Sequence, residues 1–367
     1  MLLSELLPWL APHSTSGPVS RSVERITHDS RNAGPGDIFV AIRGQTQDGR
    51  RFVPGLDVAA VVADAPVEAS EGTTVVYVED AREALSAGAA ALSGFPSEKM
   101  FMVGLTGTNG KTTTSWLIER LAMAAGMRVG VVGTLGNRIQ GEPSRLQDGF
   151  TTPEAAQLQP LLAEMYESGC QLVAMEVSSI GLALRRTRHV RFDVAVFTSF
   201  TRDHLDFHGD MEAYLEAKRK LFGQLRSPQS TALLNAEVDA CSQTRTHGSR
   251  RWTFGAGGDI RAENVTETLD GIEADLSFLG KSHRLRLPLA GLHNLYNAMA
   301  ALASVHAAGV PVEEAVEALA SVGQIPGRLE RVDAGGGIAV FVDYAHTPDA
   351  LCKALQTLGG LCAGRVI

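Results

Sequence analysis

Short apolar runs alternate with longer stretches of helical spacing through the middle of the chain. Strands are predicted at 100–105, 128–132, 171–177 and 192–197, and helices at 111–125, 153–167 and 211–223. Strands that alternate with helices favour a parallel sheet covered by helices on both faces. In such a sheet the binding site lies beyond the carboxyl ends of the strands. The pattern therefore predicts an α/β fold with its functional residues at that edge.

Shorter elements are predicted on both sides of this region. The earlier ones are strands at 38–42, 58–63 and 74–78 and a helix at 81–93. The later ones are antiparallel strands at 272–278 and 283–289, helices at 291–306 and 311–322, a buried strand at 338–342 and a helix at 348–358. Breaks at 94–97 and 325–330 predict three domains, at 1–98, 99–328 and 329–367.

The last residues of the chain have the pattern of a strand that is just beginning. They are Arg365, Val366 and Ile367. One complete strand and one helix cannot enclose a core. We therefore expect the third domain to be incomplete and the chain to be truncated within it.

Composition narrows the class of protein. The net charge of −8 argues against a nucleic-acid-binding protein. The four cysteines are scattered, as is typical of reduced thiols in the cytosol. We find no signal peptide and no apolar run long enough to cross a bilayer. We therefore expect a cytoplasmic enzyme that binds neither nucleic acid nor membrane. We also expect a monomer, although the sequence carries no direct signal of oligomeric state.

A glycine-rich turn separates the strand predicted at 100–105 from the helix that begins at Lys111. This layout is that of a phosphate-binding loop, in which backbone N–H groups approach phosphate oxygens. Lys111 adds a positive charge, and the Thr112 hydroxyl can hold Mg²⁺. Leu105 stands where the common pattern has glycine, and a tight turn with a surface lysine is the alternative. The candidate residues are Gly107, Thr108, Asn109, Gly110, Lys111, Thr112 and Thr113.

Two further candidate segments follow predicted strands. Glu176 ends the apolar run that begins at Leu172. Its carboxylate could hold a metal beside the phosphate loop, or it could pair with an arginine such as Arg185 or Arg186. The segment 201–210 is dense in ionisable groups, and His204 within it is a candidate metal ligand. A solvated loop is the alternative for that segment.

Lys218 lies on the apolar face of the helix predicted at 211–223. A lysine removed from water has a lowered pKa and becomes a nucleophilic neutral amine. Such an amine can react with CO₂ to give a carbamate, an anion able to ligate Mg²⁺. The alternative is a lysine that extends its ammonium group to water, and periodicity alone leaves both open.

Polar residues in the last quarter of the chain are further candidates. Asn294 and Asn297 lie three apart on one face of the helix predicted at 291–306. Paired amides there could bind an adenine edge or stabilise the helix start. Arg328 lies in the linker predicted at 325–330, and Asp343 follows the strand predicted at 338–342.

Motifs along the whole chain resemble those of one known family. They are Asp29–Arg31, Gly36–Ala41, Asp48–Arg50, Gly107–Thr113, Thr151–Pro153, Met175–Ser179, Thr201–Asp206, Lys218, His293-Asn294 with Asn297, Gly327–Glu330 and Asp343–Pro348. Together they resemble the Mur ligase family, and within it the MurE type, which adds the third peptide residue to the peptidoglycan precursor. Most of that family's third domain is absent from this chain.

Three positions depart from the family pattern. Ile180 and Leu184 stand where many relatives have histidine and glutamine, and Ser199 stands where asparagine is common. We expect one polar contact to the substrate to be lost, or to be replaced by Arg185. None of the three departures touches the phosphate chemistry.

The resemblance implies an N-terminal α/β UDP-binding domain, a central P-loop domain with a mostly parallel sheet, and the start of a Rossmann-like C-terminal domain. It implies that Ser30 lies near the uridine, and that Thr151, Thr152, Ser178 and Arg186 lie along the muramoyl-dipeptide. The implied Mg²⁺ ligands are Thr112, Glu176, His204 and Lys218 as its carbamate. The implied ATP contacts include Asn294, Asn297, Arg328 and Asp343, and the implied catalytic residues are Lys111, Lys218, His204 and Arg328.

The reaction implied by the resemblance is an ATP-dependent, ADP-forming ligation. The D-Glu γ-carboxylate of UDP-MurNAc-L-Ala-D-Glu forms an acyl phosphate, and the amine of a diamino acid, expected to be meso-2,6-diaminopimelate, displaces the phosphate. Alternatives are L-lysine as the amino acid, another Mur ligase or a folylpolyglutamate synthase, and a fragment that binds substrate or nucleotide without turnover. A P-loop GTPase is disfavoured because the sequence contains no guanine-reading NKxD motif.

Overall fold

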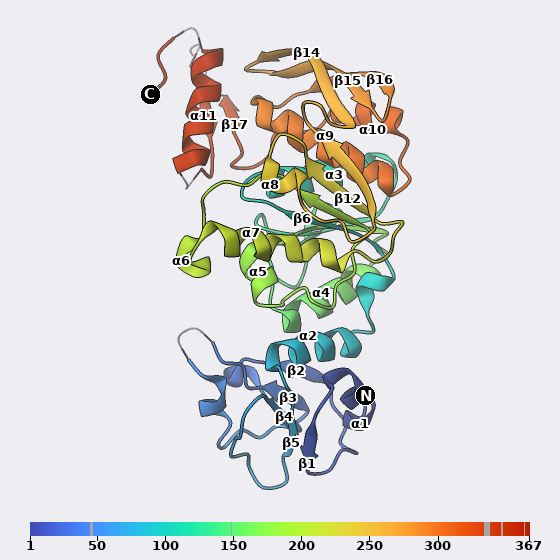
Figure 1. The fold of residues 1–367 in the computed structure, drawn as a ribbon, viewed down its shortest axis with the longest axis vertical. Coiled ribbons are helices and arrows are strands. Elements are labelled where there is room, and N and C mark those ends of the chain that lie inside the picture. Colours follow the sequence, from blue (N-terminus) through green and yellow to red (C-terminus); the bar gives the residue numbers. More distant parts are fainter. Residues whose placement is uncertain (45–46, 148, 334–337, 346–347, 363) are drawn as a thin grey trace. The chain divides into compact units, whose positions relative to one another are not determined.

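The computed structural model describes residues 1–44, 47–147, 149–333, 338–345, 348–362 and 364–367. The chain forms two compact units (Figure 1). Unit 1 consists of Met1–Lys99, Pro153–Glu167 and Gly181–Val190, and unit 2 consists of Met100–Thr152, Ser168–Ile180 and Arg191–Ile367. Two segments from the middle of the sequence therefore belong to unit 1. The three-domain division expected from the sequence stays a prediction.

Unit 1 is built on a five-stranded sheet. Its strands are β1 (Ser14–Ser16), β2 (Arg25–Thr27), β3 (Asp37–Val40), β4 (Ala60–Ala63) and β5 (Thr74–Tyr77), and its helices include α1 (Leu3–Leu10), α2 (Ala81–Leu92) and α4 (Ala155–Glu167). The strand order is β1-β5-β4-β3-β2, parallel except for the antiparallel β1–β5 pair. Alternate residues of β3 fill different cores, because Ile38 and Val40 pack in one cluster and Phe39 in another.

Unit 2 contains an eleven-stranded sheet. Its strands are β6 (Phe101–Thr106), β7 (Val129–Val132), β8 (Arg138–Ile139), β9 (Glu142–Pro143), β10 (Leu172–Glu176), β11 (Val194–Phe197), β12 (Thr231–Asn235), β13 (Arg250–Phe254), β14 (Ile260–Thr268), β15 (Gly271–Phe278) and β16 (Lys281–Leu287). The order is β16-β15-β14-β13-β12-β11-β6-β10-β7-β8-β9. The seven neighbouring strands from β14 to β7 in this order pair in parallel. Strands β15 and β16 at one end, and β8 and β9 at the other, pair antiparallel. The mostly parallel central sheet predicted from the sequence is confirmed, although β13 and β14 were not predicted.

Unit 2 also contains α-helices. They are α3 (Lys111–Ala124), α5 (Ser179–Ala183, which continues into unit 1), α6 (Leu205–His208), α7 (Met211–Arg219), α8 (Asp239–Ser242), α9 (Leu292–Ala307), α10 (Val312–Leu319) and α11 (Pro348–Leu361). Helix α7 begins at Asp210, whose carboxylate accepts a hydrogen bond from the Ala213 N–H. The helix predicted at 211–223 ends earlier, because a 3₁₀ turn takes over at Lys220–Gln224.

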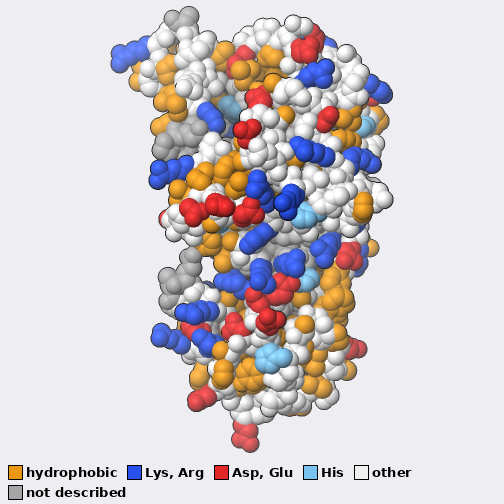
Figure 2. Space-filling view, in the orientation of Figure 1, with side chains coloured by type: hydrophobic (Ala, Val, Ile, Leu, Met, Phe, Trp, Pro, Cys, Tyr) orange, Lys and Arg blue, Asp and Glu red, His pale blue; other side chains and the backbone are white. Residues whose placement is uncertain are grey.

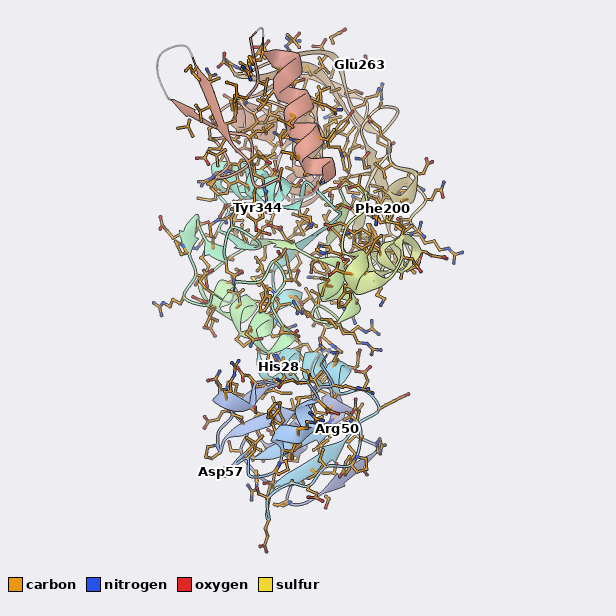
Figure 3. All side chains as sticks on the ribbon, turned by 90° about the vertical axis from the view of Figure 1, so that its left-hand side faces the viewer. His28, Arg50, Asp57, Phe200, Glu263 and Tyr344 are labelled. Atoms are coloured by element: carbon orange, nitrogen blue, oxygen red, sulfur yellow. The ribbon has the colours of Figure 1, made fainter. Side chains whose placement is uncertain are left out.

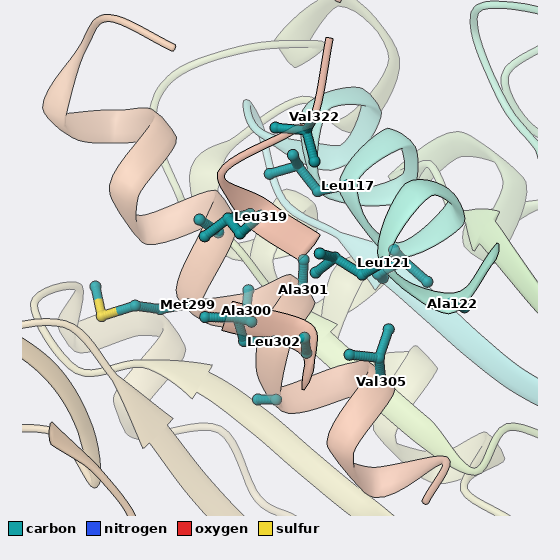
Figure 4. Packing of buried hydrophobic residues seen from close by; sticks show 14 of the residues in the cluster. Leu117, Leu121, Ala122, Met299, Ala300, Ala301, Leu302, Val305, Leu319 and Val322 are labelled. Atoms are coloured by element: carbon teal, nitrogen blue, oxygen red, sulfur yellow. The ribbon is translucent and has the colours of Figure 1, made fainter. Parts of the chain in front are cut away.

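The main core of unit 2 lies where α3, α9 and α10 meet (Figure 4). Helix α3 begins directly after the candidate phosphate loop, so this packing fixes the loop from one side. The residues of this core include Leu117, Leu121 and Ala122 from α3, Ala301, Leu302 and Val305 from α9, Leu319 from α10, and Val322 from the turn after α10.

A buried ion pair joins α3 to the start of β8. The Glu119 carboxylate is fully buried and accepts from Arg138 Nη2 at 2.9 Å. The Arg138 guanidinium also lies over the Trp116 ring, 5.0 Å from its centroid. Breaking a buried pair by removing one partner is costly, because a charge is left without compensation.

We expect Glu119→Ala to lower the free energy of unfolding by about 3–5 kcal/mol, measured by urea denaturation. The matched control is the double variant Glu119→Leu/Arg138→Met, which removes both charges. It should recover most of the loss, since no unpaired charge remains. A Glu119→Ala variant as stable as the wild type would show that the pair contributes little.

The C-terminal segment differs from the prediction in two respects. Strand β18 (Ala339–Val342) pairs only with β17 (Glu330–Asp333), in a two-stranded antiparallel sheet. Its Val340 and Val342 are exposed, so the prediction of a buried strand is wrong. A two-stranded hairpin buries little apolar surface by itself. The strand predicted to start at Arg365 is also not formed in the described residues 364–367.

The surface is of mixed character. Figure 2 shows basic, acidic and hydrophobic side chains interspersed on the face turned to the viewer. No helix of the described part of the chain is both long and apolar enough to cross a membrane.

Candidate active site

The glycine-rich loop lies between β6 and α3, as predicted. Gly107 has φ +145° and Gly110 has φ +92°, conformations that favour glycine. A Cβ at Gly107 would lie 2.0 Å from Thr198 Oγ1, and one at Gly110 would lie 2.5 Å from Asn297 Oδ1. Both glycines are therefore required for the backbone to turn and for neighbouring side chains to approach it.

Hydrogen bonds to the segment after β11 fix the loop in place. The Asn109 N–H donates to Ser199 Oγ at 2.8 Å, and the Thr108 N–H donates to the Ser199 carbonyl at 2.9 Å. Thr198 Oγ1 donates to the Asn109 carbonyl at 2.6 Å. Ser199 thus takes part in loop support at a position where the family commonly has asparagine.

Two lysine amines converge on one carbonyl of the loop. Lys111 Nζ and Lys218 Nζ each donate to the Gly107 carbonyl at 2.8 Å. Lys218 is 1 % exposed, so the alternative in which it extends to water is excluded. Burial lowers the pKa of Lys218 well below its usual range, and the nearby Lys111 charge lowers it further. The geometry therefore favours a neutral amine at Lys218.

Tyr214 is a site residue that the sequence analysis did not single out. Its ring centroid lies 4.3 Å from Lys218 Nζ, and its hydroxyl lies 3.1 Å from Thr108 Oγ1. Phe200, labelled in Figure 3, stacks on the ring at 5.3 Å. Burial raises the pKa of Tyr214 to about 12, so the phenol stays protonated and packs Lys218 against the loop.

Glu176 lies beside the start of α3. It is 1 % exposed, and its Oε2 accepts from Thr112 Oγ1 at 3.0 Å. The alternative of an arginine partner is wrong: Arg185 pairs with Asp80 at 3.1 Å, and Arg186 with Glu154 at 2.8 Å, all within unit 1. Glu176 is instead held by hydroxyl and backbone donors.

Thr112 and Glu176 fit a Mg²⁺ ion. A hydroxyl and a carboxylate oxygen 3.0 Å apart supply the hard oxygen donors that Mg²⁺ prefers. Gly133 keeps the neighbouring backbone close, since a Cβ there would lie 2.3 Å from Glu176 Oε1. Within the described ranges, no group of three or more His, Cys, Asp or Glu side chains could hold a metal. The fit therefore rests on this hydroxyl–carboxylate pair.

His204 lies in the loop that leads into α6. Its backbone is left-handed, with φ +50°, and its Nε2 lies 3.4 Å from Asp203 Oδ2. Burial lowers the pKa of His204, and the neighbouring Asp203 carboxylate opposes this shift only in part. The neutral imidazole favoured here is the form that ligates metals.

Arg328 and Asp343 organise the linker before β17. Arg328 Nη2 donates to Thr112 Oγ1 at 3.2 Å, and its guanidinium lies 5.3 Å from the centroid of the Tyr344 ring, labelled in Figure 3. The Asp343 carboxylate accepts from the N–H groups of Leu329 at 2.7 Å and Ala345 at 2.8 Å. The linker thus brings an arginine to the phosphate loop. His346 and Thr347 of the same motif lie outside the described residues.

The two asparagines of α9 are buried next to the loop. Asn297 Nδ2 donates to Asn294 Oδ1 at 3.2 Å, and Asn294 Nδ2 donates to the Ala290 carbonyl at 2.7 Å. Thr114 Oγ1 lies 3.4 Å from Asn297 Oδ1. Asn294 thus bonds the backbone directly before the helix, which begins at Gly291 without a side-chain cap, while Asn297 lies against α3 and Gly110 of the loop.

The candidate substrate residues are divided between the units. In unit 2, Thr152 Oγ1 donates to the Glu176 carbonyl at 3.0 Å and accepts from the Ser178 N–H at 2.9 Å. Thr151 lies next to it, with its Oγ1 3.0 Å from Thr134 Oγ1. In unit 1, Ser30 begins a 3₁₀ turn capped by Asp29, and Arg186 pairs with Glu154.

Comparison with known proteins identifies the family. The model for the Mur ligase middle domain matches residues 105–305, more than half of the chain. The chain belongs to the Mur ligase family. The model for the Mur ligase glutamate ligase domain matches residues 327–367. The first match contains the phosphate loop, Glu176, His204 and Lys218, and the second contains Arg328 and Asp343.

Individual Mur ligases show the same relationship over the whole chain. A protein of Geobacter metallireducens named UDP-N-acetylmuramoyl-L-alanyl-D-glutamate–2,6-diaminopimelate ligase is 38% identical and aligns with 100% of this chain and 74% of its own. A Deinococcus radiodurans protein named UDP-N-acetylmuramyl-tripeptide synthetase is also 38% identical, covering 100% of this chain and 76% of its own. A solved structure of a UDP-N-acetylmuramoyl-L-alanyl-D-glutamate–2,6-diaminopimelate ligase superimposes with a TM-score of 0.81 at 26% identity, covering 98% of this chain and 74% of that one.

Proposed function

We propose that this Mur ligase joins meso-2,6-diaminopimelate to the D-Glu γ-carboxylate of UDP-MurNAc-L-Ala-D-Glu, with conversion of ATP to ADP and phosphate. The observation that carries the proposal is the alignment, at 38% identity over all of this chain and 74% of the relative, with a protein named for this reaction. The site supports it, because a phosphate loop, two converging lysines and a linker arginine lie together in unit 2.

The reaction proceeds through an acyl phosphate. The γ-carboxylate attacks the γ-phosphate of ATP, the bond to the bridging oxygen breaks, and ADP leaves. The amine of diaminopimelate then attacks the acyl carbon, loses a proton, and displaces inorganic phosphate. The main electrostatic obstacle is that the first step brings two anions together.

This chain supplies cations and oriented donors against that repulsion. Lys111 lies at the start of α3, where the loop N–H groups and the helix dipole also favour phosphate. Arg328 reaches the same position from the linker. Both side chains would stabilise the charge that develops on the transferred phosphoryl group.

Thr112 and Glu176 would hold Mg²⁺, with His204 and the Lys218 carbamate as further ligands. The metal ion would supply positive charge to the phosphate oxygens. Asn294, Asn297 and Asp343 would support the ATP site, since Asn297 lies against Gly110 of the loop, Asn294 bonds Asn297, and Asp343 shapes the linker that carries Arg328. Thr151, Thr152 and Ser178, with Ser30 and Arg186 of unit 1, would contact the UDP-MurNAc-dipeptide.

A phosphate-release assay tests the function. Release should require ATP, UDP-MurNAc-L-Ala-D-Glu and meso-diaminopimelate together, and UDP-MurNAc-L-Ala should not replace the dipeptide substrate. Equal or better turnover with L-lysine would change the amino acid but keep the reaction, an outcome that the less specific name of the Deinococcus radiodurans relative leaves open.

Calorimetry separates binding from turnover. If the chain binds UDP-MurNAc-L-Ala-D-Glu more tightly than UDP-MurNAc-L-Ala but shows no turnover, its role is to bind substrate. Equal binding of UDP-MurNAc-L-Ala would contradict the proposed substrate.

A further inference from the structure

Thr134, which follows β7, holds both oxygens of the Glu176 carboxylate. Its backbone N–H donates to Glu176 Oε1 at 3.0 Å, and its hydroxyl donates to Oε2 at 3.1 Å. The carboxylate cannot rotate about its last torsion without breaking one of these bonds. Thr134 therefore fixes the plane of the carboxylate that faces Thr112.

The hydroxyl of Thr134 also connects Glu176 to a candidate substrate residue. An ionised carboxylate only accepts hydrogen bonds, and a hydroxyl has a single proton to give. Since Thr134 gives its proton to Glu176, it accepts from Thr151 Oγ1 at 3.0 Å. A continuous path of hydroxyl groups thus leads from Thr151 to the carboxylate.

Thr112, next to the phosphate loop, contacts the same carboxylate. Arg328 donates to Thr112 Oγ1, which donates to Glu176 Oε2. An ionised carboxylate has about four lone-pair sites. The bonds from Thr112 and Thr134 use three of them, which leaves room for a cation.

The loop that carries Thr134 is anchored independently of its hydroxyl. Arg138 donates to the carbonyls of Leu135 at 3.3 Å and Gly136 at 3.4 Å, while its pair with Glu119 ties it to α3. Loss of the Thr134 hydroxyl should therefore leave the loop backbone in place. The effect of such a loss falls on Glu176 and Thr151.

We propose that Thr134 is a positioning residue that orients the Glu176 carboxylate for Mg²⁺ and connects it to Thr151. This inference rests on the proposed function, because it takes the phosphate loop to bind a magnesium nucleotide. Partners that orient a metal ligand typically change metal affinity about 10–100-fold when they are removed.

The test measures ADP binding to the full chain by calorimetry at a series of Mg²⁺ concentrations. Thr134→Val keeps the side-chain shape and the backbone N–H but removes the hydroxyl. It should raise the Mg²⁺ concentration for half-maximal ADP binding about 10-fold. Thr134→Ser retains a hydroxyl and should stay close to the wild type. The matched control is Thr266→Val, at an exposed position of β14, which should leave the midpoint unchanged.

The outcomes separate this inference from the proposed function. If the wild type shows Mg²⁺-dependent ADP binding and Thr134→Val has the same midpoint, the inference is overturned and the function stands. Equal increases in the valine and serine variants would also overturn it, since the hydroxyl would not be the cause. A wild type without Mg²⁺-dependent ADP binding would overturn both. Melting temperatures of all variants establish that each is folded.

Discussion

Lys218→Ala should reduce the ligation rate by about 10²–10³-fold, the scale of a lost electrostatic contact to a transition state. The side chain is fully buried, donates to the Gly107 carbonyl, and has a lowered pKa that favours the neutral amine. A neutral amine can take up CO₂ and become an anionic ligand beside the phosphate loop. Phosphate release with all three substrates measures the effect.

A short carboxylic acid such as acetate should partly restore the Lys218→Ala variant, because it returns a carboxylate to the space that the side chain leaves. The matched control is Lys220→Ala, an exposed lysine two residues away, which should keep wild-type activity. Full activity of Lys218→Ala without added acid would contradict the carbamate, and loss without rescue would restrict Lys218 to a packing role against Tyr214.

Lys111→Ala should reduce ATP-dependent turnover by about 10³-fold or more, the scale of a cation that stabilises the charge of a transferred phosphoryl group. Lys111 donates to the carbonyls of Gly107 and Thr108 at 2.8 and 3.0 Å, which holds its amine across the loop. Its removal takes a side-chain amine away from the start of α3, where phosphate is proposed to bind. Phosphate release and ADP affinity should both fall.

The comparison for this variant is Lys281→Ala, an exposed lysine at the start of β16. This variant removes the same charge at a position outside the loop, so turnover and ADP affinity should stay unchanged. Turnover in Lys111→Ala at the wild-type rate would show that the loop is a structural turn.

The phosphate loop could be predicted because its signal is local. The signal consists of an apolar run, a glycine-rich turn and a helical pattern, which follow one another within some 25 residues. The structure forms β6 and α3 there. Lys218 could be placed on the apolar side of its helix by spacing alone. Its burial could not be decided in that way, since the groups that enclose it come from the loop and from Tyr214.

Other parts of the site depend on contacts between distant segments. Thr134 is an ordinary residue in sequence, and its importance appears only where β7 and β10 lie side by side and bring it to Glu176. The prediction for β18 was wrong for a related reason: its apolar residues indicate burial, but it forms a two-stranded hairpin in which Val340 and Val342 are exposed. The local sequence pattern predicts helices and strands, whereas contacts between distant segments decide which of their side chains are buried.

The two edges of the large sheet have a consequence for the behaviour of this protein in concentrated solution. Open sheet edges recruit strands from other molecules, and charge or proline on an edge opposes this. Strand β9 ends in Pro143, which has no N–H to donate, and β16 exposes Lys281, Arg284 and Arg286. Edge-to-edge aggregation through this sheet is thus disfavoured at both ends.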